Sequence, residues 1–323
     1  MIIIEKKKNL DLLINKSSNI FIVGHKYLDL DAIGSNIGMY EYVKSFGKKA
    51  TIIVNDKYKE AGVKKLIEKI NKKYRIENSG KIKNKIREDS LLIVTDTNKE
   101  SLLQDKDLIN MFNNIVVIDH HEYNETSIQK GLIIVDEHLS SASEMVTYLL
   151  NSITDKIPKL VATALLAGIV LDTNNFALKT SKDTYMAAYI LSNNGADPDE
   201  IQSLLKQNIK TYIERNKMLT SVKIINNVAI ASAKGSLIYR REDLAKVADL
   251  LLQFNGIECS FAIGRIDKNK FGVSGRSVGL LNVGDVLEYL NGGGNAYEAA
   301  AQVETRYVKD VLEELKEALK NFK

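Results

Sequence analysis

Two clusters of possible metal ligands stand in the N-terminal half of the chain, each directly after a run of four apolar residues. The clusters consist of His25, Asp29 and Asp31, and of Asp119, His120 and His121. Histidine nitrogens and carboxylate oxygens, without cysteine, suit Mn²⁺, Fe²⁺, Co²⁺ or Zn²⁺. For the first cluster alone, a polar loop with a helix cap, a turn former and a solvated histidine is an equally good interpretation.

Two further acids extend the pattern. Asp96 follows a strand-like run at 90–95, and Asp172 ends an apolar helix predicted at 159–171. Three of the four histidines belong to these clusters, and His138 is the fourth. Because the carboxyl ends of parallel strands meet at one edge of a sheet, we expect these side chains to converge. Such a set suits two ions about 3.5–4 Å apart that share a carboxylate, as in two-metal phosphoester hydrolysis.

The elements that must position these residues alternate between strand and helix as far as residue 216. This alternation predicts an α/β fold with a parallel sheet and helices on both faces. Hairpins predicted at 223–231 and 259–276 indicate a second, smaller α/β domain. We therefore expect three parts, namely a metal-binding domain at 1–197, a linker helix at 198–218 and a second domain at 219–323.

Several local expectations accompany this division. A Lys-rich amphipathic helix is predicted at 57–73, with its charged side in solvent. Ser141 and Glu144 have the spacing of a helix capping box. After the three glycines at 292–294 we expect the start of an Ala-rich helix, and then a last strand near 302–305.

Composition limits the classes of protein to which this chain can belong. The net charge of +4 over 323 residues is too small to indicate binding of long nucleic acids. The single cysteine, Cys259, excludes a disulfide framework and a thiolate cluster, which fits the cytoplasm. No apolar run is long enough to span a membrane. If the chain is part of a longer anchored protein, we expect it on the cytosolic side.

The motifs resemble those of the DHH phosphoesterase superfamily. The resemblance rests on Asp119-His120-His121 and on the spacing His25-x-x-x-Asp29-x-Asp31. The segments at 273–277 and 292–300 are similar to the DHHA1 substrate-binding domain. Within the superfamily, residues 167–180 are similar to the GdpP-type cyclic-di-AMP phosphodiesterases.

The resemblance implies a metal centre. It implies two Mn²⁺ ions, with Co²⁺ or Mg²⁺ as substitutes, and Asp96 as the ligand between them. The implied ligands are His25, Asp29, Asp31, Asp96, His120 and Asp172. It also implies catalytic roles for Asp119, which would orient His120, and for His121, which would face the scissile phosphate.

The resemblance further implies substrate-binding residues in the second domain. Arg276 is the candidate phosphate clamp, because its planar fork matches phosphate oxygens. The other candidates are Ser274, Ser277, Gly293, Gly294 and Asn295. A surface arginine beside a hairpin and a flexible glycine turn are the structural alternatives. Asn295 stands where the family usually has histidine, and Asn174 and Lys179 stand where Lys and Arg are expected.

The resemblance implies a metal-dependent phosphoric diester hydrolase. The expected reaction is two-metal hydrolysis of cyclic-di-AMP to pApA, with hydroxide as the nucleophile. An NrnA-like enzyme that degrades pApA and short oligonucleotides, and removes the phosphate of pAp, is the alternative. A family II pyrophosphatase shares the opening motif, but the motifs of the second domain argue against it. A non-catalytic nucleotide sensor is a further alternative, but such a protein would be expected to have lost some of the metal ligands. A homodimer is possible.

Overall fold

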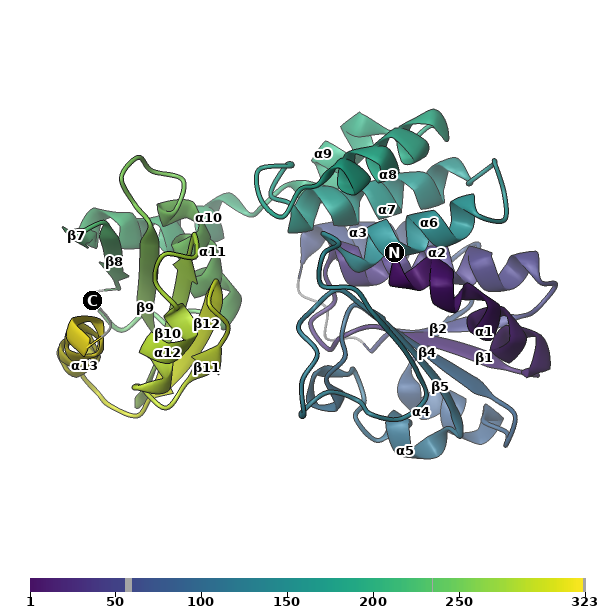
Figure 1. The fold of residues 1–323 in the computed structure, drawn as a ribbon, viewed down its shortest axis with the longest axis horizontal. Coiled ribbons are helices and arrows are strands. Elements are labelled where there is room, and N and C mark those ends of the chain that lie inside the picture. The colour runs from purple at the N-terminus through teal and green to yellow at the C-terminus, as the bar shows by residue number, and fades with distance from the viewer. Residues whose placement is uncertain (56–59, 234, 322–323) are drawn as a thin grey trace. The chain divides into compact units, whose positions relative to one another are not determined.

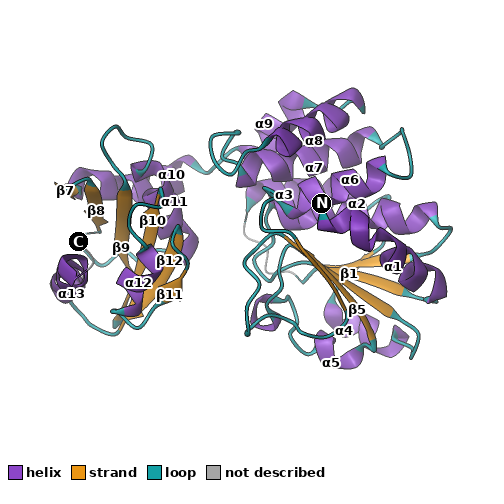
Figure 2. Ribbon diagram, viewed as in Figure 1, coloured by secondary structure: helices purple, strands orange, loops and turns teal. Residues whose placement is uncertain are grey.

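The computed structural model describes residues 1–55, 60–233 and 235–321. The chain forms two compact units, Met1–Lys206 and Gln207–Lys323. Their helices and strands are labelled in Figure 1 and coloured by type in Figure 2. Among the described residues, no helix combines the length and the apolar character that crossing a bilayer requires.

The first unit is built on a six-stranded sheet in which every described pairing is parallel, in the order β3-β2-β1-β4-β5-β6. Its strands are β1 (Ile20–Val23), β2 (Ala50–Ile53), β3 (Ile76–Glu77), β4 (Leu91–Thr95), β5 (Asn114–Asp119) and β6 (Leu132–Val135). The short strands β1, β2 and β4 are buried along their whole length, as expected where helices cover both faces.

Helices lie on both faces of this sheet, which confirms the predicted architecture (Figure 2). They are α1 (Ile2–Lys16), α2 (Leu30–Ser45), α3 (Ala61–Ile70), α4 (Ser79–Ile82), α5 (Leu108–Met111), α6 (Ala142–Asn151), α7 (Lys159–Asp172), α8 (Lys182–Asn193) and α9 (Pro198–Leu205), with 3₁₀ turns at Lys83–Lys85 and Glu100–Leu102. Alternate residues of β1 belong to different cores. Ile20 and Ile22 pack with α2, α6 and α7, whereas Phe21 and Val23 pack against Phe112 near α5.

The second unit has a mixed six-stranded sheet in the order β11-β12-β10-β9-β8-β7. Its strands are β7 (Lys223–Ile225), β8 (Val228–Ser232), β9 (Cys259–Asp267), β10 (Lys270–Ser277), β11 (Gly293–Gly294) and β12 (Glu298–Val303). Its helices are α10 (Ile209–Asn216), α11 (Arg241–Leu251), α12 (Val283–Glu288) and α13 (Val308–Asn321), with a 3₁₀ turn at Lys217–Ser221. The pair β8 and β9 is parallel, and the other described pairs are antiparallel.

Two local predictions are wrong. The expected helix at 198–218 is divided, because Asn208 caps a new helix by accepting from the backbone N–H groups of Lys210 and Thr211. The expected Ala-rich helix start is strand β12, in which Ala299 and Ala301 are buried. Pairing with β10 and β11 overrides the helix propensity of alanine there.

Two further predictions agree with the structure only in part. Residues 57–59 of the predicted helix at 57–73 lie outside the described residues, and α3 covers Ala61–Ile70. Ser141 caps α6 by accepting from the N–H of Glu144. The carboxylate of Glu144 does not complete the capping box at Ser141, because it accepts from the N–H and hydroxyl of Ser140.

Candidate active site

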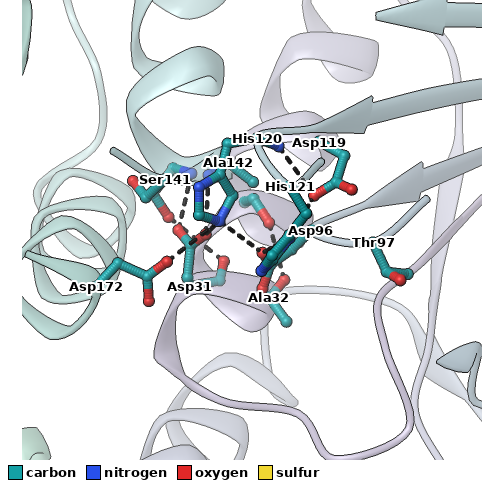
Figure 3. A network of polar contacts seen from close by, with 12 residues as sticks. Asp31, Ala32, Asp96, Thr97, Asp119, His120, His121, Ser141, Ala142 and Asp172 are labelled. Carbon is teal, nitrogen blue, oxygen red and sulfur yellow. Dashed lines mark hydrogen bonds and ion pairs between the residues drawn. The ribbon is translucent and has the colours of Figure 1, made fainter. Parts of the chain in front are cut away.

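A cluster of histidines and carboxylates occupies the carboxyl edge of the parallel sheet, as Figure 3 shows. His120 lies at its centre, just after β5. Its Nε2 is 3.2 Å from Asp172 Oδ2, 3.4 Å from Asp96 Oδ1 and 4.0 Å from Asp31 Oδ2. These side chains come from β5, the end of α7, the end of β4 and the first turn of α2, so the tertiary fold alone brings them together.

Asp96 belongs to a second group as well. Its Oδ2 is 3.3 Å from His25 Nε2, and that nitrogen is 3.5 Å from Asp29 Oδ2. One oxygen of Asp96 therefore faces His25 and the other faces His120. Within each group, the possible ligand atoms lie within 4.8 Å of one another. The structure thus brings together all six residues that the sequence nominated as ligands.

Backbone amides hold the two acids of the β1 loop. Asp29 caps α2, since its Oδ1 accepts from the N–H groups of Asp31 and Ala32, and its Oδ2 is left toward His25. Both oxygens of Asp31 accept 2.8 Å hydrogen bonds from the first N–H groups of α6, those of Ala142 and Ser143. A helix N-terminus favours an ionised carboxylate there.

Two backbone features accompany this arrangement of the acids. A Cβ on Gly168 of α7 would lie 2.8 Å from Asp31 Oδ1, so this position has no room for a side chain. Asp96 has a φ of 58°, in the left-handed region that aspartate tolerates better than most residues. Strain of this kind is common at functional sites.

Asp119 and His121 form a pair beside the cluster. Asp119 Oδ1 accepts from the backbone N–H of His120 and lies 2.8 Å from His121 Nδ1. Asp119 therefore orients the ring of His121, and not the ring of His120 as the resemblance implied. The side chain of His120 is 4% exposed and that of His121 is 56% exposed, so of these two rings it is that of His121 that faces solvent.

The buried charges of the cluster shift one another's pKa values. Burial raises the pKa of Asp31 well above its usual range, and the nearby Asp96 and Asp172 add to the rise. Burial also raises the pKa of Asp172. Burial opposes ionisation of Asp96, but His120 and His25 outweigh it and lower the pKa of Asp96.

The donor set fits divalent metal ions. Asp96 Oδ1 and His120 Nε2 are both buried, and neither has a hydrogen-bond partner among the residues that the structure describes. Buried polar atoms without partners are costly, and a shared cation would satisfy both at once. Mixed imidazole and carboxylate donors without cysteine match Mn²⁺, Fe²⁺, Co²⁺ or Zn²⁺.

The metal-free protein is expected to lose stability as the pH rises above about 6.5. Burial lowers the pKa of His25, but Asp29 and Asp96 outweigh it and raise that pKa well above 6.5. The pKa of His120 is raised in the same way by Asp172 and Asp96. A raised folded-state pKa stabilises fully below the unfolded value of about 6.5, and this stability is lost as the pH passes the folded value.

Thermal unfolding after chelation would measure this trend, with Mn²⁺ added in a parallel series. Because protons and metal compete for the same nitrogens, Mn²⁺ should raise Tm more at pH 8 than at pH 6. A Tm without pH dependence in the metal-free protein, or an equal gain at both pH values, would contradict this assignment.

In the second unit, Ser274, Arg276, Gly293 and Gly294 line a cavity of about 520 Å³. Arg276 is held firmly in it. Its Nε donates to Asp249 at 2.6 Å, and its Nη1 donates to the Gly275 carbonyl at 2.9 Å and to Ser274 Oγ at 3.3 Å. The arginine is therefore a largely buried, hydrogen-bonded part of the cavity wall and not an exposed surface side chain.

The other two candidates serve local turns. Ser277 Oγ accepts from the N–H of Gly279, and Asn295 Oδ1 accepts from the N–H groups of Tyr297 and Glu298. Neither is among the described residues that line the cavity. Sequence reasoning missed Asp249, because no local signal pairs an acid on α11 with an arginine 27 positions further along the chain.

Comparison with known proteins agrees with this geometry. Residues 19–169 match the model of the DHH family N-terminal domain, and residues 226–322 match that of the DHHA1 domain. The chain is 36% identical over 318 residues to "Cyclic-di-AMP phosphodiesterase GdpP" of Geobacillus thermodenitrificans, covering 96% of this chain and 48% of that protein. It is 36% identical to the GdpP of Bacillus subtilis as well, over 96% of this chain and 49% of that protein.

A shorter relative is matched along nearly its whole length. The "Bifunctional oligoribonuclease and PAP phosphatase NrnA" of Mycoplasma genitalium is 25% identical, with 93% of each chain covered. The chain spans about half the length of the two GdpP relatives.

Solved structures share the fold. The crystal structure of an exopolyphosphatase-related protein from Bacteroides fragilis has a TM-score of 0.81 and 21% identity, covering 97% of this chain and 95% of that chain. RecJ in complex with Mn²⁺ from Thermus thermophilus has a TM-score of 0.54 and 13% identity, covering all of this chain and 55% of that chain. The chain belongs to the DHH phosphoesterase superfamily, with a DHH domain followed by a DHHA1 domain.

Proposed function

We propose that this chain is a metal-dependent phosphodiesterase that hydrolyses cyclic-di-AMP to pApA. The observation that carries the proposal is the position of Asp96, whose two oxygens face two separate groups of ligands. Two metal sites that share a carboxylate suit in-line displacement at phosphorus. The identity to GdpP-type proteins along 96% of the chain favours the cyclic substrate.

The proposed cofactor is a pair of Mn²⁺ ions, for which Co²⁺ or Mg²⁺ could substitute. His25, Asp29 and Asp96 would hold one ion. Asp31, Asp96, His120 and Asp172 would hold the other. When bound, such a pair supplies a nucleophile at neutral pH and stabilises charge on the phosphoryl group.

His121 is the proposed group that contacts the reacting phosphate. Asp119 fixes its Nδ1, so Nε2 is the nitrogen left to face a substrate. From there it can donate a hydrogen bond to a phosphate oxygen or a proton to the departing 3′ oxygen. Its exposure, beside a cluster that is otherwise largely buried, suits this role.

The cavity of the second unit is a proposed binding site for nucleotide phosphate. Replacing Arg276 with alanine is expected to raise KM about 10-fold or more, with kcat within about twofold, because a charge-assisted hydrogen bond contributes about 1.5–3 kcal/mol. Arg306→Ala, an exposed arginine of the same unit that does not line this cavity, is the control. Steady-state kinetics with cyclic-di-AMP would test this, and an unchanged KM would remove the clamp.

An NrnA-like activity on pApA and short oligonucleotides is the second candidate. It is favoured by the NrnA relative, of which this chain covers 93%. Both activities would use the same metal centre, so only the substrate separates them.

A chromatographic time course decides between the two. Purified protein with Mn²⁺ is incubated with cyclic-di-AMP in one series and with pApA in another. Accumulation of pApA from cyclic-di-AMP supports the proposal. Rapid conversion of pApA to AMP, with cyclic-di-AMP untouched, would replace it with the NrnA-like function.

A further inference from the structure

The loop after β4 forms hydrogen bonds with two neighbouring loops, the one after β1 and the one after β5. On the β1 side, the N–H of Lys26 donates to the Leu102 carbonyl at 2.7 Å, and His25 forms a bridge with Leu103. On the β5 side, the N–H of Ile128 donates to the Asn98 carbonyl at 2.7 Å. The segment 97–103 therefore fixes the spacing of the two loops that carry the histidines.

Asn98 makes the side-chain contacts to the β5 loop. Its side chain is buried, with 1% of the residue exposed. Nδ2 donates to the carbonyls of His121 at 3.2 Å and Glu122 at 3.1 Å, and Oδ1 accepts from Ser127 Oγ at 2.8 Å. An amide has two N–H donors beside one carbonyl, which matches this arrangement of partners. A carboxylate of the same shape could not donate to the two carbonyls.

These contacts act on a residue that is only partly packed, with its ring centroid 4.2 Å from that of His120. His121 is held at its ring by Asp119 and at its carbonyl by Asn98. More than half of its side chain is exposed, so these two hydrogen bonds carry much of its placement. A displacement of about 1 Å in a reacting group can reduce the rate about 100-fold.

We propose that Asn98 is a positioning residue that sets where His121 stands relative to the metal centre. The proposal rests on the proposed function, since it assigns Asn98 to the same reaction. It goes beyond the ligand set, because the described contacts join Asn98 to the backbone after His120 and not to any of the six ligand side chains. The expected signature is thus a defect in turnover without a defect in metal binding.

The test is Asn98→Asp, which keeps the acceptor for Ser127 and removes the donor to His121. We expect kcat to fall about 10- to 100-fold, with KM within about twofold and Mn²⁺ affinity within about threefold of the parent chain. Asn124→Asp is the matched control: it lies in the β5 loop with His121, and its described side-chain contacts use only Oδ1, which the change retains.

A second readout reports on His121 itself. The chain has only four histidines, so their ring signals can be resolved by NMR and assigned with His121→Gln. Asn98→Asp should move the ring signals of His121 and leave those of His25 and His120 in place. If the variant does not fold, Ser127→Ala, which releases Oδ1 of Asn98, should show a smaller change of the same kind.

Three outcomes would overturn the proposal. They are an unchanged kcat, a loss of Mn²⁺ affinity in proportion to kcat, and ring signals of His25 and His120 that shift as much as those of His121. If the parent chain hydrolyses neither cyclic-di-AMP nor pApA, the proposed function fails. The ring signals still decide separately whether Asn98 places His121.

Discussion

Replacing Asp96 with asparagine is expected to reduce turnover about 1,000-fold or more. Asp96 offers one oxygen to the His25 group and the other to the His120 group, so no other side chain of the cluster serves both. An amide of the same shape is neutral and turns one of these two atoms into an N–H donor, which repels a cation. Losing metal catalysis removes several kcal/mol of transition-state stabilisation, which corresponds to this loss in rate.

The asparagine variant is chosen because it should fold. At a φ of 58°, asparagine is as well tolerated as aspartate, whereas alanine is not. Calorimetric titration with Mn²⁺ should show weakened binding at both sites, alongside the fall in kcat. Asp105→Asn, an acid in the loop that follows β4 and outside the ligand groups, is the control. Normal binding of two ions by the Asp96 variant would refute the shared carboxylate.

Replacing His121 with glutamine is expected to lower kcat about 100- to 1,000-fold, since proton transfer by a positioned side chain contributes about 10²- to 10⁴-fold. Its Nδ1 is engaged by Asp119, and its ring is the exposed one of the two adjacent histidines. Glutamine can still form a hydrogen bond but does not exchange a proton near neutral pH. Metal affinity should stay near that of the parent chain.

Measuring both kcat and metal affinity distinguishes the loss of His121 from the loss of a metal ligand. His138→Gln, at the exposed fourth histidine, should change neither quantity. If His121→Gln abolishes Mn²⁺ binding, His121 is a ligand and not the group facing the phosphate. If the variant retains full kcat, the pair of Asp119 and His121 has no part in turnover.

The sequence by itself determined the parallel sheet and the edge at which the candidate histidines and acids gather, and the resemblance to the DHH superfamily selected six of them as ligands. The reason is local: apolar runs form buried strands, and ligand types directly after them must lie at the carboxyl ends. The presence of a second, smaller α/β domain was also predictable, because hairpin spacing differs from alternating strand and helix. The helix break at Asn208 and the strand at 298–303 were not predicted, since a cap and long-range pairing override local propensity there.

Only the tertiary structure decided how the site is held. The carboxylate of Asp31 meets the N-terminus of α6, 111 residues away in the chain, and nothing in either segment specifies that contact. Asp119 lies beside both histidines in sequence, yet the backbone after β5 directs it to the ring of His121. Asn98, likewise, acquires its partners only where two loops meet. Local spacing can nominate a ligand, whereas its orientation depends on partners that the fold brings from elsewhere.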